Sequence, residues 1–189
     1  MLLSPRRYQN NLRTVLVGGL VTQVIEHHEA MLLLIRNNKN GSAFALARSI
    51  FEGLFRGTWF QVCATDTQLQ DFEKNDELPA GINMTTIATA IDAATTHDPQ
   101  DPNDHFTDLR KRGWPHLCSY AHSGMLQLAR RFTGEKAEPC YKDDEIIEIT
   151  TSSTTCVLLL VATFLGGQNL FTESHAAAAL IGTYGVTSP

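Results

Sequence analysis

The sequence predicts an all-α fold, arranged as an antiparallel helical bundle of four long helices plus short helices. Apolar residues recur at helical spacing over long segments and never alternate with polar residues over the length of a strand. Alanine and leucine, both strong helix formers, dominate these segments, and the prolines lie mostly outside them. The 189 residues are close to the size of an ordinary domain, so we expect one domain over residues 1–189.

Helical segments follow one another with short connections. In each of them apolar residues recur three or four positions apart, and the breaks between them are rich in residues that favour turns. The expected helices span residues 10–38, 42–64, 66–74, 84–96, 104–132, 143–165 and 173–183.

The first three helices carry distinct local signals. Gly18-Gly19 would permit close packing or a kink in the first helix. The second is expected to begin at Ser42, whose hydroxyl suits an N-cap, and apolar residues cover nearly all of its sides. That pattern is typical of a central helix. Thr65-Asp66 is expected to cap the third helix.

The later helices are delimited by proline, glycine and charge. Residues 97–103 contain two prolines and break the chain after the fourth helix. Gly113 and Pro115 interrupt the fifth, which is therefore either one kinked helix or two helices. Residues 143–145 place negative charge at the start of the next helix, where the helix dipole favours it. Gly166-Gly167 is expected to end that helix.

The cysteines and the apolar runs bear on the compartment. No two cysteines form a C-x-x-C pair, and each is expected to be a small buried residue in a reducing environment. The N-terminus lacks the pattern of a secretory signal. The apolar run Cys156–Leu165 is about ten residues long, shorter than the ~20 that span a bilayer. We therefore expect a cytoplasmic protein that does not enter a membrane. The cysteines are Cys63, Cys118, Cys140 and Cys156.

Charge is unevenly distributed along the chain. The net charge of −5 argues against bulk, non-specific binding to nucleic acid. The segment from Arg110 to Lys136, however, carries six basic residues against Glu135 alone. This segment predicts either a local basic surface or simply solvated helix faces.

Metal and cofactor motifs are largely absent from the sequence. It contains no phosphate-binding loop, no dinucleotide-binding glycine motif, no H-E-x-x-H and no G-x-S-x-G. Glu26-His27-His28-Glu29 resembles a metal-binding cluster, but adjacent residues on a helix point about 100° apart and cannot converge on one ion. We expect no metal and no cofactor.

Two charges lie within the aromatic face of the central helix. Arg48 and Glu52 are four residues apart on a face shared with aromatic residues such as Phe51 and Phe55. Because an unpaired buried charge is costly, the two are expected to pair. The pair is either a structural ion pair that fixes helix register or an anion-binding arginine oriented by a glutamate. Arg56 lies at the edge of the same stripe.

A histidine on the fifth helix is the second candidate. His122 is expected to share a helical face with Cys118 and Met125, and it is either a core residue or a group for proton transfer. If its helix packs on the central helix, His122 could meet Arg48 and Glu52. These three are the candidate catalytic residues. The candidate ligand-binding residues are Arg56, Trp59 and Arg130.

Two motifs together suggest a family. Leu46–Trp59 and Tyr120–Gly124 resemble an uncharacterised bacterial all-helical family, whose members carry an R-S-x-F-E-x-x-x-R-x-x-W helix and a later Y-x-H-x-G helix. The resemblance covers roughly residues 42–131. It brings no activity with it.

A more distant resemblance is to HEPN domains (higher eukaryotes and prokaryotes nucleotide-binding). Their signature is an arginine four to six residues before a histidine, a spacing that Arg110 and His116 match. Lys111 stands where that family usually has a small polar residue, and Pro115 falls inside the motif. The resemblance implies a helical, often dimeric protein that acts on RNA or nucleotides, as a metal-independent ribonuclease or a defence or toxin protein.

Two functions are therefore carried forward. In the first, His122, preferred over His116, is the general acid or base on a 2′-hydroxyl, and Arg48 stabilises charge on phosphorus. In the alternative, the chain is a non-catalytic bundle that binds a small ligand or a protein partner, with Arg48, Glu52 and His122 as a structural polar core. A homodimer or other homo-oligomer fits both. Residues 157–165 and 176–179 would supply its interface or belong to the core.

Overall fold

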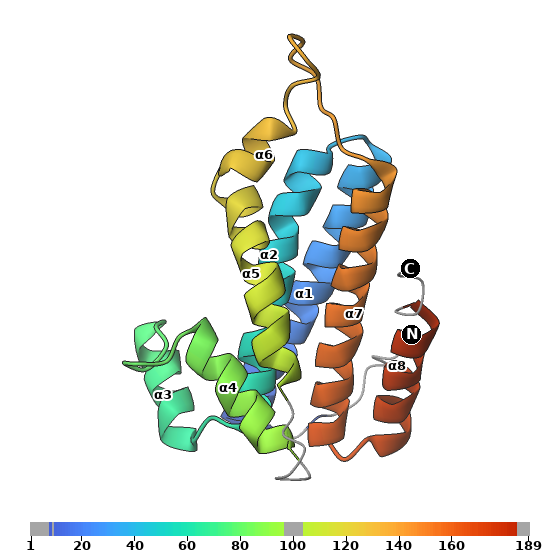
Figure 1. Cartoon of the computed structure of the whole chain (residues 1–189). Helices are drawn as coiled ribbons and strands as arrows, with labels where there is room; N and C mark the ends of the chain where they lie inside the picture. Colours follow the sequence, from blue (N-terminus) through green and yellow to red (C-terminus); the bar gives the residue numbers. More distant parts are fainter. Residues whose placement is uncertain (1–7, 9, 97–103, 185–189) are drawn as a thin grey trace.

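Helices make up most of the part of the chain that the structure describes (Figure 1). The computed structural model describes residues 8, 10–96 and 104–184. Within those residues there is no β-strand, only an isolated bridge between Thr133 and Lys136. The all-α prediction is confirmed. The helices are α1 (Leu12–Arg36), α2 (Asn40–Val62), α3 (Asp66–Asn75), α4 (Met84–Thr95), α5 (His105–Ala121), α6 (Met125–Ala129), α7 (Asp143–Gly167) and α8 (Phe171–Tyr184).

The long helices α1, α2, α5 and α7 run alongside one another, with α3 and α4 at one end and α6 at the other (Figure 1). A tight turn reverses the chain between α1 and α2, and Gly53 of α2 lies against Val24 of α1. Leu160 of α7 lies against Gly57. The missing side chains at these two glycines allow α2 to approach both neighbours closely.

The core is centred on α2, as its apolar pattern predicted. Ile50, Leu54 and Phe55 of this helix are fully buried, and α2 packs on α1, α4, α5 and α7. Buried residues of α7 and α8 complete the core, which places most of residues 157–165 and Ala177 inside the fold. The partly buried residues of α2 then lie on its remaining, outward strip.

The junction of α1 and α2 differs from the expected one at Ser42. Helix α2 begins two residues earlier, at Asn40, and its N-cap residue Lys39 makes no side-chain capping bond. The turn itself satisfies backbone groups, because Asn38 adopts a left-handed conformation and its N–H donates to the carbonyl of Ile35. Thr65 caps α3 as predicted, through a capping box with Gln68.

The start of α5 is held by an aspartate on another helix. Asp92 of α4 is buried, and its carboxylate accepts hydrogen bonds from the backbone N–H groups of Phe106 (2.8 Å) and Thr107 (2.9 Å). Asp104, the residue before α5, makes no side-chain capping bond. Asp92 therefore does the work of an N-cap and fixes α5 relative to α4. The predicted break at residues 97–103 lies outside the described residues.

The end of α5 corrects the expected 104–132 helix. The chain continues as a helix through Gly113 and Pro115 and stops instead at Ala121. Ser123 is left-handed, and the N–H of Gly124 donates to the carbonyl of Ser119 at 2.7 Å, which is a Schellman ending. His122 consequently caps α5. The prediction that it shares a continuous helical face with Met125 is wrong, because the helix ends before His122.

Helix α7 is the one helix of the described residues long and apolar enough to cross a membrane by length and composition. An 18-residue window in it has a mean hydropathy of 1.6, although a third of that window is buried in the fold. The core helix of a soluble protein meets the same criterion, so the observation is weak evidence for a membrane span. The four cysteines are free thiols, and Cys156 of α7 is buried.

Candidate functional site

Arg48 and His122 meet at the surface between α2 and α5. Nη1 of Arg48 lies 2.7 Å from Nε2 of His122. A guanidinium can only donate, so Nε2 accepts and the ring proton lies on Nδ1. His122 is exposed and the Arg48 side chain retains 26% exposure. The predicted convergence of these two residues therefore occurs, and it occurs where solvent can enter.

Glu52 stands between two arginines of the same helix. One carboxylate oxygen lies 2.5 Å from Nη2 of Arg56, and the other lies 3.7 Å from Nη2 of Arg48. The three side chains are 24–33% exposed. Two positive charges share one negative charge, so the group has an excess positive charge of one.

Trp114 supports Arg48 from the α5 side and was not among the residues predicted from the sequence. The guanidinium carbon of Arg48 lies 4.9 Å from the centroid of the Trp114 ring, within the range of a cation–π interaction. Trp114 also contacts Phe51 of α2, with ring centroids 6.1 Å apart. Arg48 is thus held by Trp114, Glu52 and His122. Trp114 precedes His122 by eight residues, about two helical turns. This spacing is the feature of the sequence that could have placed Trp114 on the same side of α5 as His122.

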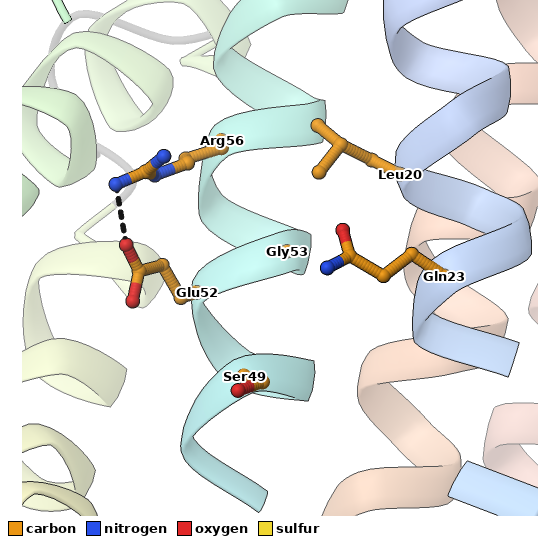
Figure 2. A pocket seen from close by; sticks show the side chains of 6 residues that line it. All are labelled: Leu20, Gln23, Ser49, Glu52, Gly53 and Arg56. Atoms are coloured by element: carbon orange, nitrogen blue, oxygen red, sulfur yellow. Dashed lines mark ion pairs between the residues drawn. The ribbon is translucent and has the colours of Figure 1, made fainter. Parts of the chain in front are cut away.

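A pocket of about 230 Å³ opens beside this group, between α1 and α2 (Figure 2). Figure 2 shows Glu52 and Arg56 on one side of α2 and the α1 side chains on the other, with Ser49 and Gly53 between them. Gln23 and Ser49 are exposed polar residues that were not predicted from the sequence to belong to a site. The lining residues are Leu20, Gln23, Ser49, Glu52, Gly53 and Arg56.

Two other predicted ligand contacts lie elsewhere. Trp59 is 3% exposed and packs against Phe60 in the core, so it does not line the pocket. Arg130, the residue after α6, forms an ion pair with Glu145 of α7. The same end of the bundle holds Tyr141, whose hydroxyl donates to Gln127, and burial raises the pKa of that tyrosine. Arg130 therefore helps to attach the connection between α6 and α7.

The side chains of the two remaining sequence motifs, Arg110 with His116 and the Glu26–Glu29 cluster, do not converge on one site. Arg110 is half-buried and His116 is exposed, and six residues place them about 120° apart around the axis of α5. On α1, His28 faces α7, and its Nε2 lies 3.3 Å from the hydroxyl of Thr154. Glu26 and Glu29 are exposed. Among the described residues, no group of three or more His, Cys, Asp or Glu side chains could hold a metal ion.

No curated protein and no solved structure matches the chain. One family model does match, over residues 21–180, a range that includes α2, the end of α5 and every residue that lines the pocket except Leu20. Its description is that of a family of unknown function, which agrees with the expected uncharacterised all-helical family. Because the match covers most of the chain, this protein belongs to the family of unknown function DUF6988.

Proposed function

We propose that this protein is a HEPN-like, metal-independent ribonuclease or nucleotide-directed protein that uses Arg48 and His122. The observation that carries the proposal is the 2.7 Å contact between these side chains, 74 residues apart in the sequence. A phosphate-binding cation and a proton-transfer group in contact, both open to solvent, are the groups that RNA cleavage through the 2′-hydroxyl requires.

The contact defines how the two residues would act. In the free protein, Arg48 occupies the lone pair on Nε2 of His122. When RNA binds, its phosphate accepts the arginine N–H groups and frees that lone pair. His122 then removes the proton from the 2′-hydroxyl as the 2′-oxygen bonds to phosphorus. The 5′-oxygen leaves and takes a proton from water, which yields a 2′,3′-cyclic phosphate and a 5′-hydroxyl.

Glu52 has a positioning role in this proposal. It lies between Arg48 and Arg56 and restrains both guanidinium groups. Its single charge does not balance the two arginines, so the group still attracts an anion. Arg48 contributes charge stabilisation to the phosphorane as negative charge increases on its oxygens.

The site differs from what the non-catalytic alternative requires in one respect. A structural polar core would be sealed from solvent, with its polar atoms paired internally. Here His122 is exposed, and the buried Nε atoms of Arg48 and Arg56 have no hydrogen-bond partner. These observations are compatible with the non-catalytic alternative only if the bundle binds a small ligand at this site without reacting with it.

A cytoplasmic location and a homo-oligomeric state belong to the same proposal. Free thiols support a reducing compartment. Large apolar side chains on and after α6 are exposed, including Met125 and Phe132, and support association of copies. Sedimentation equilibrium on the purified chain tests the homo-oligomeric state. A monomer at all concentrations would contradict it.

The experiment that tests the proposal compares two histidine variants on single-stranded RNA without added metal and with chelator present. His122→Ala is expected to abolish cleavage while the far-ultraviolet circular dichroism stays unchanged. His116→Ala, an exposed histidine of the same helix, is the matched control and retains cleavage. Products should end in 2′,3′-cyclic phosphate. Cleavage that survives in His122→Ala, or no cleavage by the wild-type protein, contradicts the proposal.

A further inference from the structure

The guanidinium of Arg48 has a single hydrogen bond within the described residues, and that bond goes to His122. Glu52 lies 3.7 Å from it, beyond hydrogen-bond distance, and the same carboxylate lies closer to Arg56. The buried Nε of Arg48 has no hydrogen-bond partner. In the proposed reaction the bond to His122 breaks when a phosphate binds. Another contact must therefore keep the guanidinium in place during that exchange.

Trp114 makes a contact of the kind that survives such an exchange. The guanidinium carbon of Arg48 lies over the Trp114 ring, 4.9 Å from its centroid. A cation–π contact arises from attraction between the positive charge and the negative face of the ring, so it does not depend on where the N–H groups point. Arg48 can therefore redirect its N–H groups from His122 to a phosphate while its charge stays over the ring.

The packing of α5 on α2 fixes the Trp114 ring. The ring is half-buried and contacts Phe51, with centroids 6.1 Å apart, and Phe51 is stacked on Phe55 at 4.6 Å. Gly113 lies against Phe51, where a Cβ atom would come within 3.3 Å of Cε2, so α5 approaches α2 closely beside Trp114. The ring is thus a restrained surface on which the long, flexible side chain of Arg48 rests.

We propose that Trp114 is a positioning residue for phosphate binding, which holds the charge of Arg48 beside His122 while Arg48 exchanges its hydrogen bond for one to a phosphodiester oxygen. This role rests on the proposed function, which supplies the exchange. An arginine that moves freely loses rotamer entropy when it binds a phosphate, and the contact with Trp114 reduces that loss in advance. Removal of the ring should therefore weaken the binding of the phosphodiester.

Calorimetric titration with a deoxydinucleotide measures this effect, because the missing 2′-hydroxyl prevents cleavage. Trp114→Leu is expected to weaken binding roughly fivefold, and Trp114→Phe, which keeps an aromatic face, by less. The matched control is Phe106→Leu, which removes an aromatic contact of the same helix with Phe55 of α2 and should keep wild-type affinity. Circular dichroism checks that each variant is folded. Equal affinities of Trp114→Leu and Phe106→Leu overturn the positioning role.

An isosteric replacement separates the electrostatic contact from packing. Mono- and difluorotryptophan keep the shape of the ring nearly unchanged but weaken the negative potential of its face. The affinity for the deoxydinucleotide should fall as the number of fluorine atoms rises. The second tryptophan of the chain, Trp59, is in the core, so the fluorinated Trp114→Phe protein is the control and should show no such trend. An affinity of the labelled wild-type chain that does not depend on fluorine contradicts a cation–π role.

The effect of Trp114 on Arg48 can also be measured without a ligand. In the free protein Arg48 occupies Nε2 of His122, which keeps the ring proton on Nδ1. If Trp114 holds Arg48, Trp114→Leu should move part of that proton population to Nε2, which nitrogen-15 spectra of the ring detect. Phe106→Leu should leave the tautomer unchanged. A His122 tautomer that is the same in Trp114→Leu and wild type overturns the positioning role.

Failure of the positioning role and failure of the proposed function give different results. If His122-dependent RNA cleavage is present but Trp114→Leu changes neither the affinity nor the tautomer, only the role of Trp114 is wrong. If Trp114→Leu changes the tautomer but the wild-type protein cleaves no RNA, Trp114 positions Arg48 and the nuclease proposal is wrong.

Discussion

Nη1 of Arg48 donates a hydrogen bond to Nε2 of His122 at 2.7 Å. Because the donor is a permanent cation, the histidine that accepts from it is neutral. The contact depends on two helices, since Arg48 is on α2 and His122 follows the last turn of α5. Whatever fixes α5 against α2, or α2 against its neighbours, therefore also controls the candidate site.

Asp92 is one of these determinants, and its removal is predicted to destabilise the fold. Asp92→Ala leaves the N–H groups of Phe106 and Thr107 without their buried acceptor. We expect the free energy of unfolding to fall by about 2–3 kcal/mol. Urea denaturation measures the change. Asp71→Ala, at an exposed position on α3, should change it by less than about 0.5 kcal/mol. Equal effects of the two variants would show that the capping bonds contribute nothing.

Gly53 controls the approach of α1 to α2. A Cβ atom at this position would overlap Cγ2 of Val24, so Gly53→Ala should separate the helices and lower the free energy of unfolding by about 1–3 kcal/mol. Gly19→Ala is the control, because nothing lies within 4 Å of its Cβ position. That variant should gain about 0.5–1 kcal/mol, since alanine favours a helix. Thermal unfolding distinguishes the two, and stabilisation by Gly53→Ala is incompatible with the packing described.

His28 predicts a dependence of stability on pH. The hydroxyl of Thr154 donates to the carbonyl of Thr150, so it accepts from Nε2–H of His28, and the buried Nδ1 has no partner. Burial lowers the pKa of His28 from its ordinary value of 6.5, the effect of Glu29 being smaller and opposite. The unfolded chain therefore binds a proton more readily than the folded one.

Stability should consequently fall as the pH drops below about 6.5, and the His28 contribution should be complete above that value. His28→Gln removes the titrating group, so its free energy of unfolding should change less with pH between about pH 7 and pH 5. Urea unfolding at several pH values measures both slopes. An unchanged slope in His28→Gln would assign the pH dependence to other groups.

The helices themselves could be predicted, because apolar periodicity and capping residues are local signals. The end of α5 could not, since its left-handed residue is Ser123, where a glycine would have marked the helix end. The sequence predicts a contact between Arg48 and His122, because each is a polar residue on an otherwise apolar helical face. It forms, but through a residue at the helix end instead of one on a continuous face.

The pocket was missed although the register needed to find it was available. A short turn near residue 38 pairs α1 with α2 so that Val24 meets Gly53. Extending that pairing places Gln23 and Leu20 beside the turns of α2 that carry Gly53 and Arg56. Trp59 was selected for its spacing from Arg48, but its ring points into the core. Side-chain direction around a wholly apolar helix is set by its neighbours, and a single helix cannot reveal it.

The central claim is that Arg48 and His122 form one anion-responsive unit, and nitrogen-15 spectra of the histidine side chains test it most directly. Without ligand, His122 should be neutral, with the proton on Nδ1 and Nε2 as acceptor. Titration with a deoxydinucleotide should shift both ring nitrogens as Arg48 turns to the phosphate, and Arg48→Gln should abolish the shift. A ring with its proton on Nε2 in the free protein, or ring resonances that do not respond to the dinucleotide, would contradict the account.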